Sequence, residues 1–259
     1  MEVIIAGLLL PFMGTVAGSA FVFFMNKDIP VKLQKTLLGF ASGVMVAASV
    51  WSLLIPGIER CSDMGRLAVL PIVAGFMFGI LFLLGIDHAT PHLHIGLSQP
   101  EGPRSKISRT AMLSLAVTIH NLPEGMAVGA VLAGAIQNQM DISVAGAMAM
   151  SLGIAIQNIP EGAIISMPMR AEGNSKTRSF IIGSLSGAVE PIGGIAVILL
   201  ASLLTPILPY MLAFAAGAMI YVVVEELIPE ASEGDHSNLG TIGFAVGFAI
   251  MMSLDVILG

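Results

Sequence analysis

Charged residues are scarce in this 259-residue chain, where they make up 11 % of the total while hydrophobic residues make up 56 %. An ordinary soluble domain carries about 25 % charged residues. The mean hydropathy is +0.91. Because a chain of this composition cannot cover its surface with polar groups, we predict an integral membrane protein.

Other absences exclude further classes of protein. The 11 Lys and Arg residues against 17 Asp and Glu give a net charge of −6 and form no basic stripe, which excludes a nucleic-acid partner in practice. The single cysteine, Cys61, excludes an intrachain disulfide and a thiolate cluster. No Walker-type phosphate-binding motif occurs, so nothing indicates ATP-driven work. No basic segment precedes the first apolar run, which favours a transmembrane span there over a cleaved signal peptide.

Long apolar runs are what the chain has instead. A helix crosses the hydrocarbon in about 20 apolar residues. Runs of this length predict eight spans, at roughly 3–25, 34–56, 67–87, 108–133, 143–168, 178–203, 207–229 and 239–258. We therefore expect an all-α polytopic membrane protein with a single transmembrane domain over residues 1–259.

The basic residues predict the orientation of these spans. Nine of the 11 lie in or beside the loops that follow spans 1, 3 and 5, and the other two, Arg60 and Arg66, lie between spans 2 and 3. By the positive-inside rule the richer loops face the cytoplasm, so both termini are expected outside.

The chain also repeats itself. Span 2 contains Phe-Ala-Ser-Gly-Val-Met from Phe40 and then Leu-Ile-Pro56, while span 7 contains Phe-Ala-Ala-Gly-Ala-Met from Phe214 and then Leu-Ile-Pro229. The order fits spans 1–3 repeated in spans 6–8 with opposite direction, although spans 1 and 6, and 3 and 8, match only weakly. Spans 4 and 5 form a second inverted pair. Secondary transporters commonly have this organisation and bind substrate where the repeats meet.

Acidic side chains inside apolar runs are the main sign of chemistry. Glu124, Glu161 and Glu190 lie there, and no Lys or Arg lies deep in any span to pair with them. A carboxylate at the bilayer centre costs a few kcal/mol on insertion scales. Either these groups are protonated or a cation neutralises them, so the set suits a cationic substrate.

The spacing of two matching motifs strengthens this prediction. Span 4 reads His-Asn-Leu-Pro-Glu-Gly from His120, and span 5 reads Gln-Asn-Ile-Pro-Glu-Gly from Gln157. Residues i and i+4 share a helix face, so each motif presents a ligand pair toward its antiparallel neighbour. One imidazole, two carboxylates and three amides suit Zn²⁺, Fe²⁺, Co²⁺ or Mn²⁺, and could hold two ions. The motif prolines free a backbone carbonyl beside the ligands, and the motif glycines allow close packing.

The two motifs and the eight spans resemble the ZIP (Zrt-, Irt-like protein) family of divalent metal ion transporters over the whole chain, and Gln157 is similar to the bacterial GufA-type branch. The resemblance implies a binuclear site in which Glu124 and Glu161 bridge two ions. The first ion would be held by His120, Glu124, Gln157 and Glu161. The second would be held by Asn121, Glu124, Asn158, Glu161 and Glu190. It also implies a multi-pass protein of the cytoplasmic (inner) membrane of a prokaryote, a possible homodimer, and spans 1, 4, 5 and 6 moving against the rest.

Polar groups at the cytoplasmic ends of spans 3 and 7 are candidates for a metal pathway, namely Asp87, His88, Glu225 and Glu226. The loop histidines His92 and His94 are equally well explained as solvated surface. Asp255 in span 8 has no partner that the sequence identifies.

The sequence therefore predicts a transporter that moves divalent metal, first of all Zn²⁺, into the cytoplasm, with no cofactor and no enzymatic activity. Two alternatives stay open. A membrane-embedded metalloenzyme would use the same ligands, but no His-Glu-x-x-His motif occurs. A proton or organic-cation transporter would use the carboxylates, but an organic cation favours aromatic rings, which both motifs lack.

Overall fold

A computed structural model describes residues 2–24, 30–91, 102–103, 109–136, 143–171, 173–203 and 207–258, and every regular element within them is helical. Eight helical segments are long and apolar enough to cross a membrane, as predicted. These segments are Glu2–Phe24, Val31–Arg60, Ser62–Ala89, Ser114–Ile136, Val144–Arg170, Lys176–Ala201, Leu208–Ser232 and Leu239–Leu258. The all-α class is confirmed.

Several spans consist of more than one helix. The α-helices are α1 (Glu2–Ser19), α2 (Phe21–Phe24), α3 (Val31–Ala48), α4 (Ile55–Arg60), α5 (Val69–Ala89), α6 (Arg109–Ile136), α7 (Val144–Ala171), α8 (Lys176–Ser186), α9 (Val189–Leu203), α10 (Leu208–Val222), α11 (Ile228–Ser232) and α12 (Leu239–Leu258). A 3₁₀ segment over Ser62–Ala68 precedes α5.

Two π-helical turns interrupt spans 2 and 7 at matching places. One covers Ser49–Leu54 and the other Val223–Leu227, and each is followed at once by Ile-Pro. Proline has no N–H for the helix ladder and crowds the preceding turn, so a wider turn just before it relieves the conflict. Such turns often occur at functional sites, and the second one carries Glu225 and Glu226.

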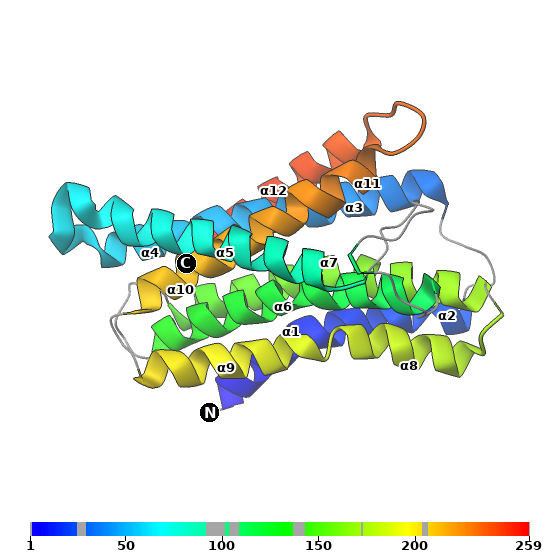
Figure 1. Cartoon of the computed structure of the whole chain (residues 1–259), viewed down its shortest axis with the longest axis horizontal. Helices are drawn as coiled ribbons and strands as arrows, with labels where there is room; N and C mark the ends of the chain where they lie inside the picture. The colour runs from blue at the N-terminus through cyan, green and yellow to red at the C-terminus, as the bar shows by residue number, and fades with distance from the viewer. Residues whose placement is uncertain are drawn as a thin grey trace.

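The helices form two bundles (Figure 1). The site bundle consists of α1, α6, α7, α8 and α9, in which α1 packs on α7 and α6 packs on α9. The second bundle consists of α3, α5, α10 and α12, in which α3 packs on α12 and α5 packs on α10. If span 1 is exchanged with span 6 and span 5 with span 4, the pair α1–α7 becomes the pair α9–α6. If span 2 is exchanged with span 7 and span 8 with span 3, the pair α3–α12 becomes the pair α10–α5. This arrangement is the one that the predicted inverted repeat would produce.

Glycines set the distance between the helices of the second bundle. A Cβ atom on Gly79 of α5 would meet the carbonyl oxygen of Phe214, and a Cβ atom on Gly247 of α12 would meet that of Phe40. Phe40 and Phe214 begin the two matching hexapeptides, so the two contacts are also counterparts. Because lipid supplies no hydrophobic force between helices, such close backbone packing is a main source of their association.

The repeat reaches further in spans 3 and 8 than the weak match found in the sequence. Both contain Gly-Phe-x-x-Gly followed by seven residues and an Asp, from Gly75 to Asp87 and from Gly243 to Asp255. The glycines of this pattern are the ones that contact the partner backbones. This pattern is hard to see in the sequence, because most of the residues between the two glycines, and the seven residues before the aspartate, differ between the two copies.

Both chain termini lie at the same end of the bundles, the left end in Figure 1. Ser143 Oγ, just before α7, donates a hydrogen bond to the carbonyl of Leu258 there (2.8 Å). At the opposite end, Lys35 Nζ donates to the carbonyl of Asp235 (2.9 Å). The side of the membrane that each end faces stays a prediction.

Adding a methyl group at Gly79 should destabilise the protein. Gly79→Ala forces α5 and α10 apart, and overpacking of this kind typically costs about 1–3 kcal/mol. Gly85→Ala is the matched control, because Gly85 lies in the same helix and faces open space. Thermal unfolding of the two purified variants in detergent measures the difference, and equal melting temperatures would contradict the packing described here.

Candidate metal centre

The seven predicted ligand residues come together inside the site bundle. His120, Asn121 and Glu124 lie on α6, Gln157, Asn158 and Glu161 on α7, and Glu190 in the first turn of α9. None of these residues is more than 6 % exposed. Both motif helices continue through their prolines.

The motif glycines bring two further helices to the centre. A Cβ atom on Gly125 would meet the backbone of Glu190 on α9, and a Cβ atom on Gly162 would meet the carbonyl oxygen of Thr15 on α1. The expectation that these glycines allow close packing is confirmed. Glu190 and Thr15 are therefore held at equivalent places beside the two motifs.

Span 6 is interrupted where it reaches the centre. Helix α8 ends at Ser186 and α9 begins at Val189, so the carbonyl of Ser186 needs a partner. Asn121 Nδ2 donates a hydrogen bond to it (3.1 Å). On the other side Asn158 Nδ2 donates to the carbonyl of Pro11 in α1 (3.5 Å). Irregular backbone at this depth is tolerated only where other protein groups satisfy its hydrogen bonds or where it lines a water-filled cavity.

Direct contacts join the two motifs and fix Glu190. Gln157 Nε2 donates to Glu124 Oε1 (2.6 Å). Thr15 Oγ1 donates to Glu190 Oε1 (3.0 Å). The side chain of Asn158 lies beside the carboxylates of both Glu124 and Glu190. Glu124 on α6 and Glu190 on α9 thus share the amide of Asn158 as a neighbour.

Several oxygen atoms of the centre are buried without a hydrogen-bond partner among the described residues. They are Asn121 Oδ1, Glu124 Oε2, Gln157 Oε1, Glu161 Oε2 and Glu190 Oε2. Buried polar atoms are otherwise almost always paired, because an unpaired one costs free energy. All five atoms are carboxylate or amide oxygens with free lone pairs, the chemistry that binds divalent cations.

His120 is turned toward the second bundle. Its imidazole Nε2 forms an ion pair with Glu226 of the π-helical turn that follows α10. In the part of the chain that the structure describes, no three His, Cys, Asp or Glu side chains are grouped to hold a metal ion. The centre is instead a mixture of amides and carboxylates, with its one imidazole engaged elsewhere.

The ZIP zinc transporter family model matches residues 98–255. The chain belongs to the ZIP family.

Members of the ZIP family match the chain over most of its length. Zinc transporter ZIP11 of Homo sapiens is 36 % identical over 323 residues, covering 95 % of this chain and 94 % of that protein. Zinc transporter GufA of Myxococcus xanthus is 36 % identical, covering 95 % of this chain and 96 % of that protein. Zinc transporter ZIPB of Bordetella bronchiseptica is 35 % identical, covering 90 % of this chain and 74 % of that protein. The predicted resemblance is confirmed, and the chain is a multi-pass membrane protein whose bacterial relatives support an inner-membrane location.

The predicted pathway residues of this ZIP family member divide into two groups. Glu226 is buried against His120, and Asp87 is buried beside the hydroxyl of Tyr221. His88 and Glu225 are exposed, and His88 Nδ1 lies 3.0 Å from the carbonyl of Leu84 in its own helix. His92 and His94 lie outside the described residues.

Sequence reasoning missed two contacts. The first is the contact of Thr15, whose only sequence signal is that it is one of two hydroxyl residues in the first apolar run, with Ser19. Asp255 had no identified partner, and the structure supplies one, since Ser52 Oγ donates to its carboxylate (2.6 Å).

Removing the Thr15 hydroxyl should destabilise the centre. Thr15→Val keeps the shape but leaves Glu190 without its hydroxyl donor, a loss that costs about 1–3 kcal/mol. Thr15→Ser keeps the donor and is the control. Thermal unfolding of the metal-free protein in detergent measures both, and a Thr15→Val protein as stable as the wild type would show that the hydrogen bond does not matter.

Proposed function

We propose that the protein carries divalent metal cations, Zn²⁺ foremost, across the membrane into the cytoplasm through the centre between α6, α7 and α9. The observation that supports this most strongly is the set of buried oxygens without a hydrogen-bond partner on five of the seven candidate ligands. A divalent cation satisfies these lone pairs and neutralises the carboxylates at once. No basic side chain lies deep in the spans to do the same.

We further propose that the centre holds two ions. His120, Glu124, Gln157 and Glu161 would ligate the first. Asn121, Glu124, Asn158, Glu161 and Glu190 would ligate the second. Glu124 contacts both Gln157, a candidate ligand of the first ion, and Asn158, a candidate ligand of the second, which supports its role as a bridge. Without thiolates the sites should bind moderately and release their cargo, as transport requires.

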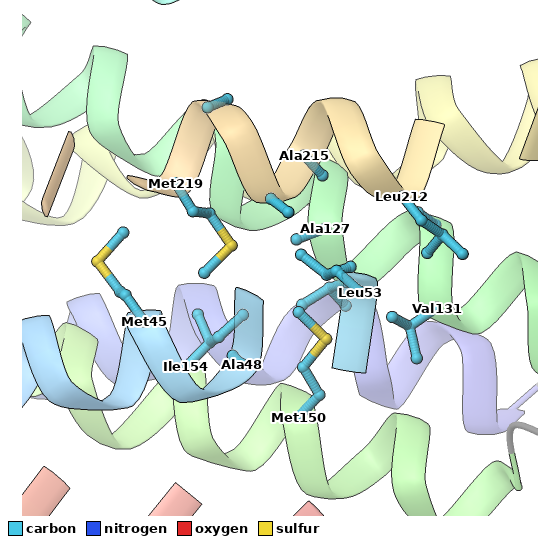
Figure 2. Close-up of a cluster of buried hydrophobic side chains, with 14 of the residues drawn as sticks. Met45, Ala48, Leu53, Ala127, Val131, Met150, Ile154, Leu212, Ala215 and Met219 are labelled. Atoms are coloured by element: carbon cyan, nitrogen blue, oxygen red, sulfur yellow. The ribbon is translucent and has the colours of Figure 1, made fainter. Parts of the chain in front are cut away.

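A dry apolar cluster separates the centre from the end of the protein that carries the termini. Figure 2 shows side chains of α3, of the π-helical turn that follows it, and of α6, α7 and α10 packed together, among them Met45, Leu53, Val131, Met150 and Met219. Val131 follows Glu124 by about two turns on α6, and Met150 precedes Gln157 by about two turns on α7. A hydrated cation has no path through this cluster, so access from that end requires a rearrangement.

Acidic groups lead from the centre in the other direction. Glu226 contacts His120, Glu230 follows one turn later and is partly exposed, and Glu233 is exposed. Glu226 and Glu230 are also near Glu161. We propose that Glu226 accepts the metal from His120 as it leaves toward the face that the basic loops predict to be cytoplasmic. Asp87 is a candidate for the pathway only by its position beside the hydroxyl of Tyr221.

Alternating access would arise from movement of the site bundle against the second bundle. The cluster between them contains alanine and methionine, whose small or flexible side chains tolerate changes of contact. For a doubly charged ion a potential of 100 mV supplies about 4.6 kcal/mol. The single domain over residues 1–259, the homodimer and the inward direction are parts of the same proposal.

A transporter suits the centre better than an enzyme does. The names of the relatives describe transporters. A catalytic metal site keeps an open position for water, whereas here amide and carboxylate oxygens of five candidate ligands are buried without a hydrogen-bond partner and are available as ligands. The metal is accordingly cargo and not a cofactor.

Removal of both bridging carboxylates should abolish transport. Purified Glu124→Ala/Glu161→Ala protein in liposomes should take up neither Zn²⁺ nor Cd²⁺, because each proposed ion loses two ligands. Asp63→Ala removes an exposed carboxylate of the 3₁₀ segment, outside the centre and the proposed exit, and should transport at the wild-type rate. Influx that survives in the double variant would place the pathway elsewhere.

Replacing Gln157 by a stronger ligand should trade rate for affinity. Imidazole binds Zn²⁺ more tightly than an amide does, so Gln157→His should lower both KM and the maximal uptake rate. Thr177→His adds an imidazole at an exposed position of α8 and controls for the added residue. Uptake kinetics in liposomes measure both variants. Unchanged kinetics in Gln157→His would remove position 157 from the ligand set.

A further inference from the structure

A groove of about 340 Å³ lies between the two bundles, and none of the seven candidate ligands lines it. Its first wall belongs to the second bundle and includes Phe78 of α5 and Tyr210 and Phe214 of α10. Its second wall belongs to the site bundle and includes Leu122 of α6 and Ala196 of α9. The Tyr210 hydroxyl is the one polar side-chain group among the lining residues.

The groove has a direction. Tyr210 lies in the first turn of α10, and Leu200 lies near the end of α9, both at the end of the protein that carries the termini (Figure 1). Leu122 and Met126 lie in the middle of α6. The groove therefore runs from near one membrane surface toward the middle of the bilayer.

The surroundings identify what fills such a groove. An apolar space of this kind does not hold water, because it offers no hydrogen bonds. Left empty, it forfeits the dispersion contacts that its lining would otherwise make. Around a membrane protein the molecules of matching shape and polarity are the acyl chains of the lipids. Tyrosine is enriched at the membrane interface, where its hydroxyl meets lipid headgroups.

We propose that the acyl chain of one phospholipid occupies this groove, with its ester region beside Tyr210 and its tail against Leu122 and Met126. The site goes beyond the transport function and does not depend on it. Leu122 stands between Asn121 and Pro123 of the span 4 motif, so the lipid tail packs against the back of the metal-centre helix. The two walls come from different bundles, and the lipid therefore spans the boundary between them.

Photochemical labelling tests the site directly. The full-length protein is reconstituted with a phosphatidylethanolamine that carries a diazirine on one acyl chain, washed with detergent to remove loosely held lipid, and irradiated. Mass spectrometry then maps the adducts. Ala196→Phe fills the groove, because Ala196 is exposed within it, and Ala245→Phe places the same side chain on the exposed face of α12.

The expected result is one retained lipid whose adducts fall on the groove-lining peptides of α6, α9 and α10. Ala196→Phe should reduce this labelling several-fold, while Ala245→Phe should leave it unchanged. Adducts spread evenly over the exposed helices, or equal labelling of both variants, would overturn the proposal. An unlabelled groove in the wild-type protein, together with loss of the dimer in Ala196→Phe, would also overturn the proposal. A second copy of the chain would then occupy the groove.

Discussion

Three carboxylates held inside hydrocarbon, with no lysine or arginine deep in the spans to pair with them, are the constraint on which the rest of this molecule depends. Glu124, Glu161 and Glu190 are almost completely buried, and the charges nearest to Glu124 are other carboxylates. Burial of this kind is tolerated only when hydrogen bonds and a cation compensate for the lost hydration. The amides of Asn158 and Gln157, the hydroxyl of Thr15 and the proposed metal cargo supply that compensation.

The centre is an approximately two-fold arrangement whose symmetry is broken where chemistry requires it. Asn121 and Asn158 have matching roles, each donating to a backbone carbonyl of the helix packed against its motif. His120 and Gln157 occupy the same motif position with different ligands, and Glu190 and Thr15 stand at equivalent glycine contacts. The hydrogen bond from Thr15 to Glu190 thus joins the two halves of the repeat. The two proposed ion sites would accordingly be unequal.

Much of this architecture was predictable because membrane spans and helix faces are encoded locally. The eight apolar runs predicted the eight spans, since length and hydropathy suffice to identify a crossing helix. The i, i+4 spacing predicted that His120 and Glu124 share a face. The partner of each side chain was harder to predict. His120 contacts Glu226 from a span more than 90 residues away, and Asp255 contacts Ser52, because the register between distant helices decides those pairs.

The sequence by itself determined the helical class, the number of spans and the two motifs that carry the candidate ligands, because periodicity and hydropathy act within a single helix. Only the tertiary structure decided that Thr15 supports Glu190, that span 6 breaks just before Glu190, and that an apolar cluster closes one side of the centre. These features depend on how closely helices approach one another. That approach is set by glycine contacts between segments far apart in the chain, which no local pattern specifies.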